Sequence, residues 1–152
     1  MEKTRILKRM TDIKQSVSYP SSGSSSSVEG MVSACVSELM NAATSFHKLH
    51  LKVTGLGSFA AHKALNKLYD ALPGHADDLA EGFQGASEKL LSYNELAPRK
   101  LESVESGLEY LRDLVDMVSS LQSKVPYSEI VNELDNVKST LNSAKYKLLF
   151  LK

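Results

Sequence analysis

The chain has 152 residues, of which 42% are hydrophobic, and its 18 basic and 18 acidic residues cancel. This length suffices for one sizeable core and gives no sign of a second domain. The balanced charge argues against the uniformly basic surface of a dedicated nucleic-acid-binding domain. No stretch approaches the roughly 18 apolar residues of a membrane span, and the N-terminus lacks the apolar core of a secretory signal. The single cysteine, Cys35, cannot form an intramolecular disulfide. We therefore expect a cytoplasmic protein with no membrane partner.

The first 27 residues are expected to form a basic arm on a serine-rich tether. Residues 1–14 carry five basic and two acidic side chains, whereas residues 16–27 are mostly serine and have little to bury. Such a composition is typical of a flexible linker. The basic residues of the arm are candidates for contacts with DNA phosphates. They are Lys3, Arg5, Lys8, Arg9 and Lys14.

The same arm has an apolar stripe that favours a different partner. Ile6, Leu7, Met10 and Ile13 are spaced so that residues 3–15 could form a short amphipathic helix, which would dock on a protein or on a neighbouring subunit. We rank docking slightly ahead of DNA binding. Salt separates the two, because phosphate contacts weaken steeply with salt and apolar contacts do not.

Residues 28–152 are expected to form an all-α domain, an antiparallel four-helix bundle. Apolar residues recur from Val28 at alternating steps of four and three, which predicts a first helix that ends at Gly55. The Gly55–Gly57 segment predicts a tight connection, and Ser58 is a plausible N-cap for a second helix.

Two later segments carry the same repeat. It runs from Leu101 to Pro126 and again from Ile130 to Leu148. Short turns between the four helices imply antiparallel neighbours. A repeat of seven is also typical of an extended coiled coil, but short segments separated by turn residues within one chain favour the bundle.

The second helix contains a signal that interrupts helices. Pro73 is followed by Gly74 inside its apolar pattern. Proline removes a backbone hydrogen bond and clashes with the preceding turn, at a cost of about 3 kcal/mol. We therefore expect a kink or a break there.

Metal-capable side chains gather on two of the helices. His47 and His50 are one turn apart on the first helix, and His50 lies close to the core-facing stripe. Each histidine alone is more often a packed residue than a ligand. The second helix changes that balance, because four such residues, His62, Asn66, Asp77 and Glu81, follow its turns and share one face. Nitrogen and carboxylate ligands together suit iron, zinc or manganese.

Helix geometry indicates how this site would close. On a continuous helix Asn66 and Asp77 are about 16 Å apart, so one chain cannot place both on one ion. Two copies packed antiparallel across a two-fold axis would bring the histidine end of one to the carboxylate end of the other. A sharp bend at Pro73 would instead bring the two halves of one helix together. The spacing favours a site shared between subunits.

These motifs resemble a known family. The segment from Phe46 to Gly55, Phe-His-Lys-Leu-His-Leu-Lys-Val-Thr-Gly, is similar to the end of the first helix in Dps-type mini-ferritins, which typically reads His-x-x-His-Trp-x-Val-x-Gly. Phe59-Ala-Ala-His62 and Asp77-Asp-Leu-Ala-Glu81 continue the match. The resemblance implies a ferritin-like fold, two-fold dimers within a hollow homo-oligomer resembling a dodecamer, and an intersubunit ferroxidase site. The implied metal ligands are His50, His62, Asn66, Asp77 and Glu81.

Two further stretches narrow the resemblance. Residues 62–70 and 81–85 also look like Dps-like proteins encoded by tailed phages, which leaves a phage origin and association with a virion open. Three positions depart from the family pattern: Asn66 replaces the usual aspartate, Leu51 a tryptophan and Gly82 an arginine. The asparagine removes one negative charge from a cation site, so metal affinity should fall.

Two functions follow from the resemblance and its departures. The first is iron binding and oxidation, in which an oxidant takes the electrons and no catalytic residue is needed beyond the metal ligands. The storage of iron and the protection of DNA would be its purpose. The second is a structural or assembly role for a degenerate bundle without catalysis. Whether the chain is an enzyme is open at this point. No phosphate-binding glycine loop, paired cysteines or nucleophilic triad points to other chemistry.

Overall fold

The computed structural model describes residues 27–151, and within that range the chain forms four helices and no strand. This confirms the expected all-α class. The basic arm, with its predicted DNA or docking contacts, lies outside the described residues. The helices are α2 (Val28–His50), α3 (Ser58–Ser87), α4 (Val104–Gln122) and α5 (Ser128–Phe150).

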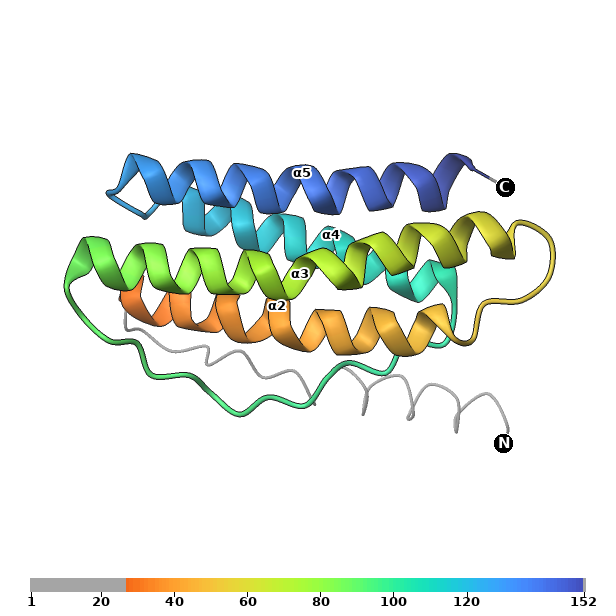
Figure 1. Ribbon diagram of the computed structural model, residues 1–152, viewed down its shortest axis with the longest axis horizontal. Helices are drawn as coiled ribbons and strands as arrows, with labels where there is room; N and C mark the ends of the chain where they lie inside the picture. The colour runs from red at the N-terminus through yellow and green to blue at the C-terminus, as the bar shows by residue number, and fades with distance from the viewer. Residues whose placement is uncertain (1–26, 152) are drawn as a thin grey trace, which may run out of the picture.

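The four helices pack as an antiparallel bundle. Contacts join α2 to α3, α3 to α5, α5 to α4 and α4 to α2, and the two helices of each pair run in opposite directions (Figure 1). The expectation of short turns throughout is wrong for one connection. Residues 88–103 run along the bundle from the end of α3 to the start of α4, so these two helices point the same way (Figure 1). This segment begins with a left-handed residue, Glu88, with φ of 56°, and contains Pro98.

The connection between α2 and α3 differs from the prediction at both ends. α2 ends at His50 rather than at Gly55, because the amide of Lys52 donates to the carbonyl of Leu49 (2.9 Å) and tightens the last turn. Gly57 precedes α3 with φ of 79°, which favours glycine. Ser58 is therefore the first helical residue and not the N-cap. The structure thus turns the chain immediately after the second histidine of α2.

Helix α3 continues through Pro73, so the expected break does not occur. Pro73 is exposed, whereas Leu72 and Ala76 on either side of it are fully buried. Packing of this face on α2 and α5 outweighs the lost backbone hydrogen bond. The continuous helix fixes the spacing between its two polar ends.

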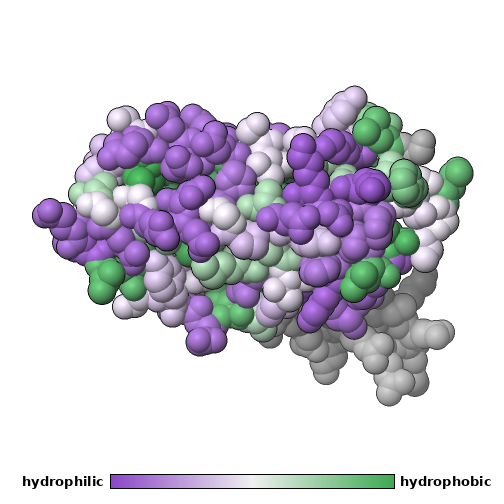
Figure 2. Space-filling view, in the orientation of Figure 1, coloured by the Kyte–Doolittle hydropathy of each residue, from purple (hydrophilic) through white to green (hydrophobic). Residues whose placement is uncertain are grey.

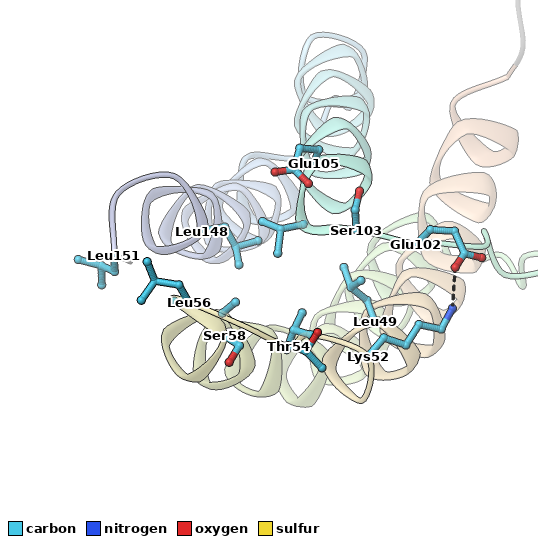
Figure 3. Close-up of a pocket in the computed structure, with 14 residues that line it drawn as sticks. Leu49, Lys52, Thr54, Leu56, Ser58, Glu102, Ser103, Glu105, Leu148 and Leu151 are labelled. Atoms are coloured by element: carbon cyan, nitrogen blue, oxygen red, sulfur yellow. Dashed lines mark ion pairs between the residues drawn. The ribbon is translucent and has the colours of Figure 1, made fainter.

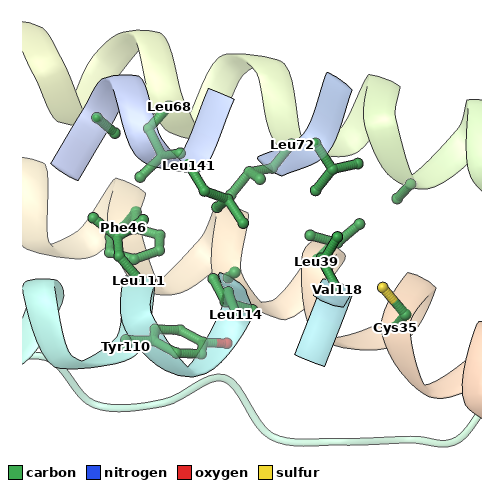
Figure 4. Close-up of a cluster of buried hydrophobic side chains, with 14 of the residues drawn as sticks. Cys35, Leu39, Phe46, Leu68, Leu72, Tyr110, Leu111, Leu114, Val118 and Leu141 are labelled. Atoms are coloured by element: carbon green, nitrogen blue, oxygen red, sulfur yellow. The ribbon is translucent and has the colours of Figure 1, made fainter. Parts of the chain in front are cut away.

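The core is a layer of leucine and aromatic side chains from all four helices (Figure 4). Phe46 of α2 stacks on Tyr110 of α4 with ring centroids 5.3 Å apart. Cys35 is fully buried among these residues, and burial, followed by the nearby charge of Glu38, raises the pKa of its thiol to about 12. Cys35 is therefore a packing residue, as its place on the apolar stripe indicates.

An arginine anchors the long connection to the bundle. The guanidinium of Arg99 lies 3.4 Å from the carboxylate of Glu38 and 2.6 Å from that of Asp113. It also lies 4.1 Å from the ring of Tyr110, whose hydroxyl donates to Glu38 at 2.7 Å. One cation thus ties the connection to α2 and α4 at once.

Candidate metal centre

Two histidines meet where α2 ends and α3 begins. The Nε2 atoms of His50 and His62 are 3.0 Å apart, and their ring centroids are 3.8 Å apart. Two nitrogen ligands about 2.1 Å from one ion, at right angles to each other, would be about 3 Å apart. The pair therefore already has the separation of two ligands of a single metal ion. The tight turn after α2 creates this approach.

A backbone contact fixes the orientation of His62. Its Nδ1 lies 3.2 Å from the carbonyl oxygen of His50. A carbonyl only accepts, so Nδ1 of His62 carries the hydrogen and Nε2 presents a lone pair. Histidine ligands in metal sites are oriented in the same way, through the other ring nitrogen. His62 thus has the tautomer that a metal ligand needs.

His50 is held as a neutral ring. Burial lowers its pKa first, and the positive charges that His62 and His47 can carry lower it further, while Asp70 opposes them. Its Nδ1 is buried and has no hydrogen-bond partner among residues 27–151. In the metal-free chain the Nε2 hydrogen of His50 points to His62. Binding a metal through Nε2 would move that hydrogen to Nδ1, so the ring would stay neutral and release no proton.

The next turn of α3 engages Asn66 in a polar chain. Its Nδ2 donates to Asp70 at 2.8 Å, and its Oδ1 accepts from the hydroxyl of Tyr69 at 3.1 Å. Tyr69 stacks on His47 with ring centroids 3.9 Å apart. Both ends of the Asn66 amide are thus occupied within the chain. The prediction from spacing missed Tyr69, although its place three residues after Asn66 and seven after His62 was a signal.

The carboxylate end of α3 is different. Asp77 and Glu81 are exposed, one turn apart, and form no hydrogen bond or salt bridge within residues 27–151. Because α3 is continuous, about 16 Å of helix separates Asp77 from Asn66. Within the described residues no group of three or more His, Cys, Asp or Glu side chains could hold a metal ion. One chain therefore brings His50 and His62 together and leaves the two carboxylates apart from them.

The surface beside the histidines is open. A hollow of about 390 Å³ is lined by Val53, Ser58, Phe59, His62 and Lys63. A second cavity of about 380 Å³ opens at the same end of the bundle, where the Lys52 to Glu102 ion pair of 3.5 Å crosses its rim (Figure 3). That second cavity is lined by a mixture of apolar, polar and charged side chains and contains none of the predicted ligands. Of these two hollows, only the first is lined by a predicted metal ligand, His62.

Two departures from the mini-ferritin pattern have clear surroundings. Leu51, where the family pattern has a tryptophan, is exposed. The position therefore supplies no aromatic ring beside the histidines. A Cβ atom at Gly82 would lie 3.0 Å from Cδ1 of Ile130, so the glycine permits α3 and α5 to pack closely there. An arginine at this position would need Ile130 to move.

Comparison with known proteins gives one match. A family described as a family of unknown function, DUF5856, matches residues 50–148. The chain belongs to DUF5856. The matched region contains His50, His62, Asn66, Asp77 and Glu81, and covers α3, α4 and most of α5. No curated protein and no solved structure matches the chain.

Proposed function

We propose that the chain is a Dps-like mini-ferritin relative that binds ferrous iron at a site shared between two subunits and oxidises it. The observation that carries the proposal is the His50 to His62 pair, with Nε2 atoms 3.0 Å apart and a backbone carbonyl orienting His62. Asp77 and Glu81 of a second copy would complete the site, with Asn66 as a weak fifth ligand. Zinc or manganese could bind the same atoms.

The topology supports a ferritin-like relationship. Ferritin-like bundles differ from simple up-down bundles by one long crossover connection. Here residues 88–103 cross the bundle, and the flanking α3 and α4 point the same way (Figure 1). The motifs that carry the sequence resemblance lie before residue 88, so this connection is a separate observation in support of the proposal.

The exposed state of the acidic residues supports a shared site. Asp77 and Glu81 face solvent without partners among the described residues. Exposed carboxylates of this kind do not destabilise the fold, and they are free to bind a ligand together with a second subunit. Two copies related by a two-fold axis would form two equivalent sites. We expect such two-fold dimers, and a larger hollow oligomer built from them.

In this proposal iron is the substrate and the protein supplies its ligands. His50 and His62 would bind Fe²⁺ through neutral nitrogen, and the carboxylates would offset its charge and favour the ferric state. An oxidant such as peroxide would take the electron from iron. No nucleophile or acid–base residue is required.

The first experiment is an anaerobic ferrous-iron titration of the purified protein, followed by addition of peroxide. Asp77→Ala should abolish tight binding and rapid ferric formation. Asp78→Ala is the matched control, because Asp78 is exposed on the same turn but points about 100° away. Wild-type protein that binds no more iron than Asp77→Ala would exclude a ferroxidase.

Mixed oligomers test whether the site is shared. His62→Ala and Asp77→Ala should each be inactive, yet co-expression should restore about a quarter of the wild-type sites, because a mixed dimer keeps one intact site of its two. A site formed within one chain would show no recovery at all.

A structural role is the second candidate, favoured by a different observation. One end of the bundle exposes a cluster of large apolar side chains (Figure 2). The cluster comprises Leu51, Leu56, Phe59, Phe150 and Leu151. Exposed clusters of this kind are typical of protein interfaces. An oligomer that persists while iron binding is absent would favour this assembly role, including one in a phage particle.

The arm and the cellular location remain proposals as well. We propose that the arm contacts DNA or docks on a protein, so that DNA protection would depend on Lys3, Arg5, Lys8, Arg9 and Lys14. Across residues 27–151 no helix is both long and apolar enough to cross a membrane. A cytoplasmic location is part of the proposed function.

A further inference from the structure

A groove between α3 and α5 carries a second set of polar side chains, away from the histidine pair. Its volume is about 220 Å³, and the small side chains of Ala64 and Ala144 form part of its floor. The two helices run side by side in opposite directions along it (Figure 1). Its polar lining consists of Lys67, Ser139, Thr140, Ser143 and Lys147.

The charge around the groove has one sign. Neither Lys67 nor Lys147 forms a salt bridge or hydrogen bond within the part of the chain that the structure describes. The sequence contains no aspartate or glutamate at 53–69 or at 136–151, the stretches that supply these lysines. The nearest acid along α3 is Asp70, which accepts a hydrogen bond from Asn66. Two lysines thus line the groove without an ion-pair partner in the described range.

The hydroxyl groups of the groove are suited to donate. Thr140 lies opposite His75 of α3, with 2.8 Å between Oγ1 and Nε2. When Nε2 of His75 donates to Oγ1, the hydroxyl hydrogen of Thr140 is free to point into the groove. Ser139 and Ser143 lie on the same side of α5. Three hydroxyl donors and two ammonium groups therefore line a short groove that contains no carboxylate.

We propose that the α3–α5 groove binds a small phosphate-bearing anion, either inorganic phosphate or a phosphomonoester. Lysine binds phosphate as a point charge, and hydroxyl groups complete the hydrogen bonding of its oxygens. A groove this short with two lysines matches one phosphate group. A nucleic-acid backbone would need a longer basic track, since its affinity grows with the number of phosphates contacted.

Calorimetric titration with inorganic phosphate tests the site. The full chain is treated with a chelator, so the result does not depend on the metal proposal, and chloride at equal ionic strength is the reference. We expect saturable binding that weakens about tenfold in Lys67→Gln and again in Lys147→Gln, as for the loss of one charge-assisted hydrogen bond each. Lys63→Gln is the matched control, because Lys63 lies on the same helix near the ring of Phe59.

The hydroxyl groups and the source of the phosphate are tested with the same titration. Ser143→Ala should weaken binding without changing the charge, which separates a built site from general attraction. A nucleoside monophosphate that binds more tightly than inorganic phosphate would assign a phosphomonoester, and equal affinity would assign phosphate itself. Unchanged affinity in the double lysine variant overturns the proposal. So does binding of duplex DNA through these lysines without any binding of inorganic phosphate.

Discussion

The two ends of α3 carry similar polar residues in very different surroundings. At the first end, α2 covers His62, and every polar atom of Asn66 is engaged within the chain. At the second end, Asp77 and Glu81 face solvent and have no partner in the described range. At the first end, contacts within the chain hold the polar side chains in place. At the second end, the carboxylates are exposed on the surface and no such contact holds them. Residues of the first kind affect both stability and binding, and residues of the second kind should affect binding alone.

The largest effect expected from this comparison is a loss of metal affinity without a loss of stability. Glu81→Gln should weaken ferrous binding by at least about 100-fold, because it removes a charged ligand. Its free energy of unfolding should stay within about 0.5 kcal/mol of wild type, since Glu81 is exposed. Parallel iron titration and urea denaturation check both statements.

At the first end of α3, where His50 packs on His62, we expect a loss of stability together with the loss of metal affinity. His50→Ala should lose both metal binding and stability, because it removes a buried ring that contacts His62 and Tyr69. If Glu81→Gln also destabilised the metal-free protein, the distinction between the two ends would be wrong.

A smaller effect is expected when an aspartate replaces Asn66. Asn66→Asp should raise iron affinity about tenfold by adding a charge to the site. Without metal it should destabilise the chain by roughly 0.5 kcal/mol, because two carboxylates then face each other across the 2.8 Å contact to position 70. Thermal melts with and without metal measure both. Asn66→Ala breaks the same hydrogen bonds and adds no charge, so it should lower the stability without raising the iron affinity.

The smallest effect concerns pH. The pKa of His50 is lowered in the fold, so the unfolded chain binds more protons once the pH falls below about 6.5, and stability is lost on acidification there. Urea denaturation of metal-free protein between about pH 7.5 and 5.5 should show this slope. His50→Gln should flatten it. An unaltered slope in His50→Gln would show that other groups control it.

Much of the fold could be predicted from the sequence, because apolar side chains spaced by three and four report helices directly. The start of α2 and the extent of α5 are close to expectation. The end of α2 was mispredicted, and the break that was one of two outcomes expected at Pro73 does not occur, because left-handed glycines and tertiary packing decide these features. The crossover was missed because residues 88–103 carry no periodic signal for direction.

The candidate site was predictable only in part. Spacing places His62, Asn66, Asp77 and Glu81 on one face, and the structure adds that His50 reaches His62 across a tight turn. Spacing could not show that Tyr69 and Asp70 occupy both sides of the Asn66 amide. A site shared between subunits depends on how two chains pack together. The spacing of residues in one sequence can suggest such a site but does not determine that packing.

The crossing of residues 88–103 also shapes how the chain can fold. α2 with α3, and α4 with α5, are hairpins whose partners are close in sequence, whereas the contacts of α3 with α5 and of α2 with α4 join distant segments. Local pairs form early because little chain must be closed to make them. The two hairpins would then dock as preformed halves. Arg99 can reach Asp113 within the second half, but its contact with Glu38 of α2 can form only once both halves are in place. The contact between Arg99 and Glu38 would therefore form in the last step of folding and stabilise the docked halves.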